Sequence, residues 1–111
     1  LSETLKVMGV KDISNDKKVT ISAPDTAENG AYVGVGVNAE IENSNMIAIL
    51  VEKNPNMLSG FFEFNSKVSP YIATKIKMAE SSNIFTVVKT TGDKYYMAKK
   101  FVSVTLGGCG S

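Results

Sequence analysis

Cys109 is the only cysteine of the chain and lies two residues from its end. Gly107, Gly108 and Gly110 surround it, and Ser111 is the last residue. Glycine has no side chain to obstruct entry into a narrow cleft, and it adopts backbone angles that are closed to other residues. Because an extended residue spans at most ~3.3–3.6 Å, the thiol can reach roughly 10 Å beyond Leu106. The arrangement predicts a swinging arm that offers a thiol to other proteins.

The same tail also has a plainer interpretation, in which the terminus is frayed and its cysteine is incidental or was placed there for labelling. Terminal residues are often poorly ordered. An exposed free thiol is open to oxidation, however, so its presence needs a reason. One cysteine cannot form an intramolecular disulfide, which leaves intermolecular pairing or a free reactive thiol. We therefore favour the functional interpretation.

The composition excludes several classes of function. The chain has no histidine, so it cannot build a Ser-His-Asp or Cys-His catalytic unit. Histidine-containing zinc sites are excluded too, and one thiol cannot supply a thiolate cluster, so no metal is expected. The net charge of +1 gives no footprint for nucleic acid or for an anionic membrane surface. No apolar run approaches the roughly 20 residues that span a bilayer.

The length of 111 residues allows one domain with one core. Residues 1–17 are expected to form an N-terminal segment, with a short helix over about Ser2–Val10 and then a polar linker. Leu5 and Met8 would share one face of this helix, and Gly9 is a suitable stop. Residues 18–106 are expected to form the main domain, and residues 107–111 the arm.

From Lys18 onward the hydrophobic pattern is that of successive strands. Val33, Val35 and Val37 alternate with other residues, as expected for one face of a strand. The continuous apolar run Met46–Val51 is typical of a strand covered on both faces, although part of it could face a partner subunit. Turn signals recur every 8–12 residues or so, and Gly92-Asp93 predicts a two-residue hairpin. The sequence thus predicts an all-β, antiparallel β-sandwich of about seven strands.

Two further patterns allow a functional and a structural interpretation. Gly34 and Gly36 share a strand face, which favours close approach of another backbone or chain, or simple crowding inside the sandwich. Glu40 and Glu42 are expected on one strand face, where they resemble a catalytic pair. The acidic residues are scattered along the chain, and a solvated face is the favoured interpretation.

The C-terminal residues 104–110, Val-Thr-Leu-Gly-Gly-Cys-Gly, resemble the signature end of the SoxY family, the sulfur carriers of periplasmic thiosulfate oxidation. Further patches resemble the family in order along the chain, at residues 18–24, 27–30, 52–56 and 73–79. The resemblance therefore extends from about Lys18 to Gly110. Two departures stand out: Ser111 replaces the usual last glycine, and Met57 stands where a second proline is expected.

The resemblance implies an immunoglobulin-like β-sandwich that pairs with a second sandwich subunit, SoxZ, in the bacterial periplasm. No signal-peptide pattern occurs in these residues. Cys109 would carry the sulfur substrate covalently, with no separate cofactor. SoxXA, a c-type cytochrome enzyme, would join thiosulfate to it, and the hydrolase SoxB would release sulfate. Where present, the sulfane dehydrogenase SoxCD would oxidise the remaining sulfur. The chain would thus be a substrate of these enzymes and not itself an enzyme.

Without SoxZ, two mobile tails would easily satisfy disulfide geometry, so a homodimer linked through Cys109 is expected. The main alternative is an immunoglobulin-like binding or interaction module whose tail cysteine is incidental. A ubiquitin-like carrier would need a chain that ends at Gly-Gly and a long helix, and the sequence shows neither. A catalytic role for Cys109 is the least favoured, because no general base is placed near it in the sequence.

Overall fold

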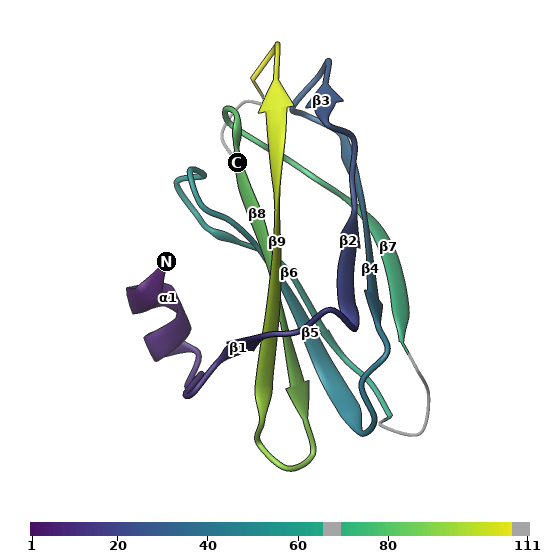
Figure 1. Ribbon diagram of the computed structural model, residues 1–111. Coiled ribbons are helices and arrows are strands. Elements are labelled where there is room, and N and C mark those ends of the chain that lie inside the picture. The colour runs from purple at the N-terminus through teal and green to yellow at the C-terminus, as the bar shows by residue number, and fades with distance from the viewer. Residues whose placement is uncertain (66–69, 108–111) are drawn as a thin grey trace.

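The computed structural model describes residues 1–65 and 70–107, in which one helix precedes nine strands (Figure 1). The helix α1 spans Ser2–Val7. The strands are β1 (Ser14–Asn15), β2 (Val19–Ser22), β3 (Thr26–Ala27), β4 (Val33–Ala39), β5 (Ser44–Val51), β6 (Leu58–Glu63), β7 (Tyr71–Ile76), β8 (Ser82–Thr90) and β9 (Tyr95–Val104). Seven of these strands have four residues or more, while β1 and β3 have two each. The prediction of an all-β chain with about seven strands and a short N-terminal helix is confirmed.

The strands form two sheets that face each other, with α1 on the outer side of the larger one (Figure 1). The larger sheet has the order β1-β9-β8-β5-β6, and β3 also pairs with β9. The smaller sheet has the order β2-β4-β7. The long strands pair in antiparallel fashion, whereas β1 and β3 each make a short parallel pairing with β9. The predicted antiparallel sandwich is therefore correct for its main strands.

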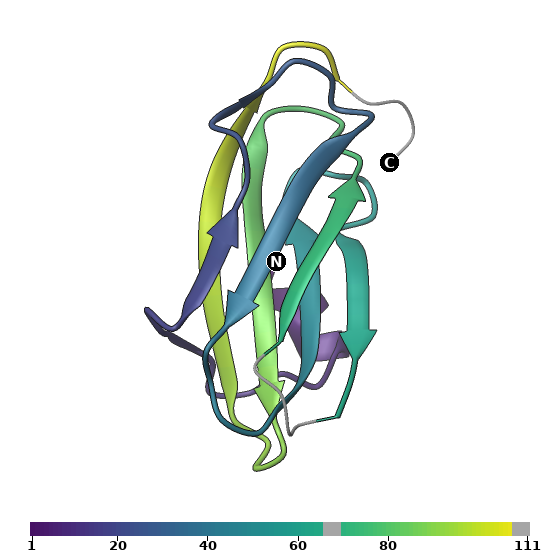
Figure 2. The same cartoon turned by 90° about the vertical axis from the view of Figure 1, so that its right-hand side faces the viewer.

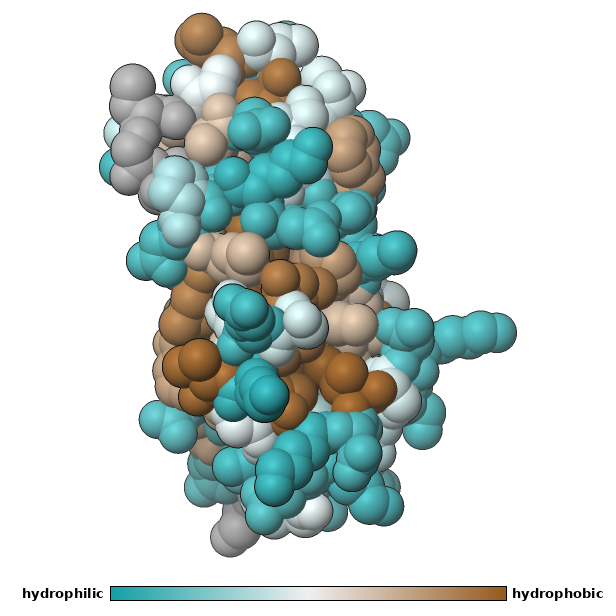
Figure 3. Space-filling view, turned by 90° about the vertical axis from the view of Figure 1, so that its left-hand side faces the viewer, coloured by the Kyte–Doolittle hydropathy of each residue, from teal (hydrophilic) through white to brown (hydrophobic). Residues whose placement is uncertain are grey.

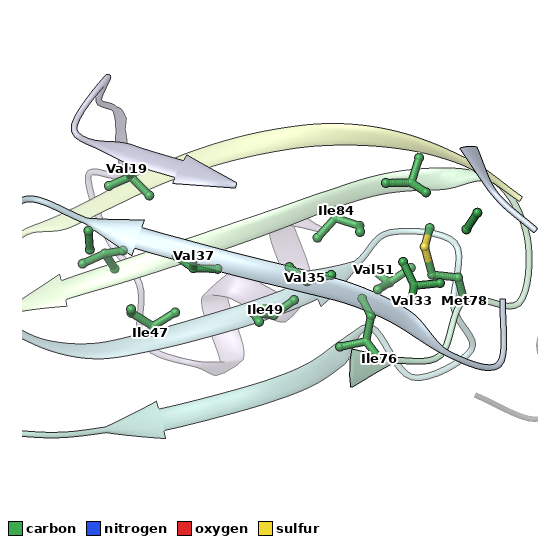
Figure 4. Packing of buried hydrophobic residues seen from close by; sticks show 14 residues of the cluster. Val19, Val33, Val35, Val37, Ile47, Ile49, Val51, Ile76, Met78 and Ile84 are labelled. Carbon is green, nitrogen blue, oxygen red and sulfur yellow. The ribbon is translucent and has the colours of Figure 1, made fainter. Parts of the chain in front are cut away.

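The central core lies between β4 of the smaller sheet and β5 of the larger sheet. Successive side chains of a strand point to opposite faces, so every second residue enters this core. On β4 these residues are the valines of the predicted alternation, which are at most 2% exposed. Figure 4 shows them packed against the residues of β5; the members on the two strands are Val33, Val35, Val37, Ile47, Ile49 and Val51.

A second cluster covers the opposite face of β5. Met46, Ala48 and Leu50 point outward there, and Leu5 and Met8 pack over them from the N-terminal segment. Strand β5 is thus buried on both faces, as its continuous apolar run predicts, and within this chain the N-terminal segment that contains α1 provides most of the second cover. Figure 3 views this side of the molecule, where apolar residues gather over the middle of the face.

The end of α1 shows why so short a helix stops where it does. Gly9 adopts a left-handed conformation with φ of 80°. Its N–H donates to the Lys6 carbonyl at 3.0 Å, and the N–H of Val10 donates to the Leu5 carbonyl at 3.0 Å. These two bonds form a Schellman motif, which satisfies carbonyls at the end of the helix. The predicted role of Gly9 as a helix stop is confirmed.

The connection between β8 and β9 differs from the predicted two-residue hairpin, and that prediction is wrong. The N–H of Asp93 donates to the Thr90 carbonyl, and the N–H of Thr90 donates to the Lys94 carbonyl, both at 3.0 Å. Asp93 has a φ of 56°, so the loop is a turn of three residues, 91–93, whose last member is left-handed. This geometry matches the twist of the flanking strands, and here an aspartate rather than the neighbouring glycine takes the left-handed position.

The helix offers a matched pair of substitutions. Leu5 is half-buried in the second cluster, whereas Val7 is 89% exposed on the same helix. We expect Leu5→Ala to lower the free energy of unfolding by about 1–2 kcal/mol, roughly half the cost at a fully buried site. Val7→Ala should leave it unchanged or slightly raised, because alanine has the higher helix propensity. Urea unfolding measures both, and equal effects would show that α1 does not stabilise the sandwich through Leu5.

Candidate functional site

The structure describes the beginning of the predicted arm. Gly107 is the last described residue, and Gly108, Cys109, Gly110 and Ser111 lie outside the described residues. The site can therefore be built from its root, the segment that leaves β9 and ends at Gly107. Figure 2 shows this segment crossing the top of the sandwich above the end of β7.

Hydrogen bonds hold the two residues that follow β9. The N–H of Thr105 donates to the Ala27 carbonyl at 3.1 Å. The hydroxyl of Thr105 donates to the Glu28 carbonyl at 3.0 Å. The carbonyl of Leu106 accepts from the N–H of Gly30 at 2.7 Å. The chain is thus tied to the β3 region up to the residue before Gly107, although the side chain of Leu106 is 63% exposed.

Gly30 connects the arm root to the smaller sheet. Its N–H donates to Leu106, and its carbonyl accepts from the N–H of Met78 at 2.7 Å. Met78 lies two residues beyond β7 and is completely buried. The turn itself is fixed by Asn29, whose side-chain oxygen accepts from the N–H of Ala31 at 2.9 Å. This turn therefore holds the ends of two distant strands together.

The side chain of Asn54 fixes the segment on which the root rests. Its amide nitrogen donates to the Lys77 carbonyl at 2.7 Å, and its oxygen accepts from the N–H of Ala79 at 2.9 Å. Asn54 is only 5% exposed, so both ends of a buried amide are satisfied. No pattern in a single sequence assigns Asn54 this bridge to residues 23 and 25 positions away.

Gly107 lies against this fixed segment. A Cβ atom placed at Gly107 would overlap the carbonyl oxygen of Ala79. Position 107 therefore requires glycine because two backbones approach each other closely there. This requirement adds to the role that the sequence predicted, in which glycines keep the arm free of side chains. The roles of Gly107, Gly108, Gly110 and Cys109 in carrying a substrate stay predictions.

A groove opens between the edge strands β6 and β7 of the two sheets. It has a volume of about 250 Å³, and Asn54, Ser59, Lys75 and Lys77 are among the residues that line it. Both lysines are exposed. The salt bridges of the described residues, Lys89–Asp93 and Lys100–Asp25, involve other lysines. The groove is therefore positively charged. The sequence analysis did not predict this groove, because its two walls come from segments that only the fold brings together.

The other candidate residues give no second site. Glu40 and Glu42 are exposed and lie in the loop between β4 and β5, so the expectation that they share a strand face is wrong. Within residues 1–65 and 70–107, no group of three or more His, Cys, Asp or Glu side chains could hold a metal ion. No helix of this part is long and apolar enough to cross a membrane, since α1 has six residues.

The two glycines of β4 have different surroundings. A Cβ at Gly36 would lie 2.8 Å from the hydroxyl of Tyr71, so this glycine makes room for a side chain of the neighbouring strand. A Cβ at Gly34 would meet nothing within 4 Å. The side chain that crowds Gly36 belongs to this chain, whereas Gly34 faces open space.

Comparisons with known proteins identify relatives of this fold and sequence. A family model described as "Sulfur oxidation protein SoxY" matches residues 5–109. The solved structure of the sulfur carrier protein SoxY from Chlorobium limicola f thiosulfatophilum matches with a TM-score of 0.83 and 30% sequence identity, covering 95% of this chain and 94% of that one. A comparison with curated proteins gives no match.

Superoxide reductases share the fold at lower identity. A putative superoxide reductase from Thermotoga maritima has a TM-score of 0.68 and 18% identity, covering 86% of this chain and 93% of that one. The superoxide reductase (neelaredoxin) from Ignicoccus hospitalis has a TM-score of 0.67 and 16% identity, covering 78% and 80%. At such identities the likeness concerns the fold alone.

The contact at Gly107 generates a prediction about the root. In Gly107→Ala the new methyl group must push the Ala79 carbonyl away, which should loosen the neighbouring bond between Gly30 and Leu106. We expect the Gly30 amide to exchange hydrogen about tenfold faster, equivalent to roughly 1.4 kcal/mol of local opening. Gly34→Ala is the control, because its methyl group enters open space. Unchanged exchange at Gly30 would show that the root does not depend on this close approach.

Proposed function

The chain belongs to the SoxY family of sulfur oxidation proteins, and we propose that it is a non-catalytic sulfur carrier with Cys109 as its loading point. The observation that carries the proposal is a single cysteine between glycines at the end of a chain that matches this family over residues 5–109. The related Chlorobium protein is itself a sulfur carrier protein by its description. The absence of histidine and of a second cysteine supports a carrier over an enzyme.

The proposed loading step forms a bond between two sulfur atoms. The Cys109 thiol loses its proton, thiosulfate attaches through its terminal sulfur, and two electrons leave to an oxidant of the c-type cytochrome class. The product, Cys–S–S–SO₃⁻, carries one negative charge. Water then cleaves the bond between the middle sulfur and the sulfonate group. This hydrolysis releases sulfate and two protons and leaves the persulfide Cys–S–S⁻.

The body of the protein would serve this chemistry as a platform. Hydrogen bonds fix the chain up to Leu106, one residue before the glycine-rich segment begins. A fixed root and a short arm without bulky side chains restrict where the thiol can be presented, which raises its effective concentration at a docked partner's site. No acid–base catalysis by this chain is needed, because the proposed reactions occur in the active sites of the partners.

We propose the partners and the location on the basis of the family. The chain would form a heterodimer with a SoxZ-like subunit in the periplasm. SoxXA would load the arm, SoxB would hydrolyse the adduct, and SoxCD, where present, would oxidise the remaining sulfur.

The carrier proposal predicts a covalent adduct at one residue. Incubation with thiosulfate, a SoxXA-type enzyme and oxidised cytochrome should raise the intact mass of the protein by that of one thiosulfate group, and reductant should remove it. Cys109→Ala should keep its mass, because the bond requires the thiol, while Ser111→Gly should load like the parent protein. If the parent and Cys109→Ala proteins stay identical in mass, the chain is better described as an interaction module with an incidental cysteine.

The glycines of the arm predict that loading and stability respond differently to a substitution there. Gly108→Val adds a branched side chain beside the thiol, and we expect it to slow enzymatic loading at least about tenfold by obstructing entry into the partner's cleft. Its melting temperature should stay within about 1 °C of the parent value, because substitutions away from packed residues change stability little. A large fall in melting temperature would contradict the idea of an undocked arm, and unchanged loading would show that entry is not narrow.

A further inference from the structure

The turn that holds the arm root contains the one Asn-Gly dipeptide of the sequence, Asn29-Gly30. The side-chain amide of an asparagine can be attacked by the backbone nitrogen of the residue that follows it. Glycine hinders this attack least, because it has no side chain and its backbone is the most flexible. Asn29 is therefore the asparagine of this chain with the highest intrinsic reactivity toward loss of its amide.

The side chain of Asn29 is prepared for this attack. Asn29 is exposed, so water can reach its amide. Its side-chain oxygen accepts a hydrogen bond from the N–H of Ala31 at 2.9 Å. That donor withdraws electrons from the carbonyl carbon, and it would stabilise the negative charge that develops on the oxygen, as an oxyanion-hole donor does. The turn thus activates the carbon atom that is attacked.

The attacking nitrogen, in contrast, is held in place. Gly30 is buried, and its N–H donates to the carbonyl of Leu106 at 2.7 Å. The nitrogen can attack only after it has lost this proton, and no base can take the proton while the junction is closed. Hydrogen exchange at Gly30 has the same requirement, because it also proceeds by removal of the amide proton in an open state. One opening motion therefore controls both reactions.

We propose that Asn29 is a site of deamidation in this protein and that the hydrogen bond between Gly30 and Leu106 is its gate. Any motion that frees the root of the arm also frees the nitrogen that attacks Asn29. The inference goes beyond the carrier function, since neither the thiol of Cys109 nor a partner enzyme takes part in the reaction.

The reaction is a substitution that needs no oxidant or reductant. A base removes the proton of the Gly30 amide, and the nitrogen forms a bond to the side-chain carbonyl carbon of Asn29. The bond between that carbon and the side-chain nitrogen breaks, and the nitrogen takes up a proton and leaves as ammonia. Water then opens the resulting succinimide ring at either of its carbonyls. The products are aspartate and isoaspartate, and both carry a new negative charge.

The two products differ in their effect on the arm root. Aspartate leaves the backbone unchanged, and its carboxylate can still accept from the N–H of Ala31. Isoaspartate routes the main chain through the former side chain, which lengthens the backbone by a carbon atom. Gly30 could then not keep both of its 2.7 Å bonds, to Leu106 and to Met78. Isoaspartate at position 29 would thus release the root, whereas aspartate would keep it.

Incubation of the whole chain at mildly alkaline pH, with reductant present, tests the gate. Peptide mass mapping follows the loss of the Asn29 amide, and NMR measures hydrogen exchange at Gly30 in the same buffer. In urea, we expect Asn29 to react before the other asparagines. In the folded protein it should react more slowly, by about the factor with which folding slows exchange at Gly30.

Two variants loosen the root by different means. Thr105→Val removes the hydroxyl that donates to the Glu28 carbonyl at 3.0 Å, and it should raise both rates about two- to tenfold, the effect of one net hydrogen bond. Gly107→Ala should raise both rates about tenfold, as expected for exchange at Gly30. Gly34→Ala is the matched control and should change neither rate, because its methyl group enters open space.

The products are compared after chromatographic separation. The N–H of Thr105 donates to the Ala27 carbonyl within the root. This amide should exchange faster in the isoaspartate fraction than in the parent protein, and at the parent rate in the aspartate fraction. Asn29→Asp supplies the aspartate form directly and serves as its reference.

Several results would contradict the proposal. Equal deamidation of Asn29 in the folded and the unfolded protein would show that the fold does not guard it. The gate also fails if exchange at Gly30 accelerates in Thr105→Val while deamidation does not, or if the folded protein stays unmodified for a time in which its Gly30 exchange predicts conversion. Equal Thr105 exchange in both product fractions overturns the release of the root. These measurements involve no thiosulfate and no Sox enzyme, so their failure would leave the carrier function standing.

Discussion

The two hydrogen bonds of Gly30 hold the end of the larger sheet against the end of the smaller one. One bond, to Leu106, fixes the chain as it leaves β9, and the other, to Met78, fixes the chain as it leaves β7. Both distances are 2.7 Å, and Gly30 is buried, so competing water is excluded from this junction. The ends of β7 and β9 are far apart in the sequence. Their attachment to one residue therefore determines where the arm starts relative to the groove between β6 and β7.

The rest of the sandwich makes such a junction rigid. Strand β5 is buried on both faces, by the central core on one side and by the cluster under α1 on the other. A small domain without disulfides depends on this packing for its stability. At the root end of β9, Val102 is buried in the central core and Val104 packs against it, so displacement of the root would disturb this core. The described part of the chain thus supports the root of the arm through packing and hydrogen bonds.

Sequence patterns predicted the structural features that depend on residues close together in the chain. They missed the contacts that the fold makes between residues far apart in it. The alternation of Val33 and Val37, the two-sided burial of β5 and the stop at Gly9 follow from local periodicity and backbone freedom, and each is present. The bridge made by Asn54 and the contact between Gly107 and Ala79 join residues more than 20 positions apart, so no local rule could find them. The loop at Asp93 was mistaken because an aspartate, not Gly92, adopts the left-handed angle. Cys109 lies outside the described residues, and its position in the sequence remains the basis for its role.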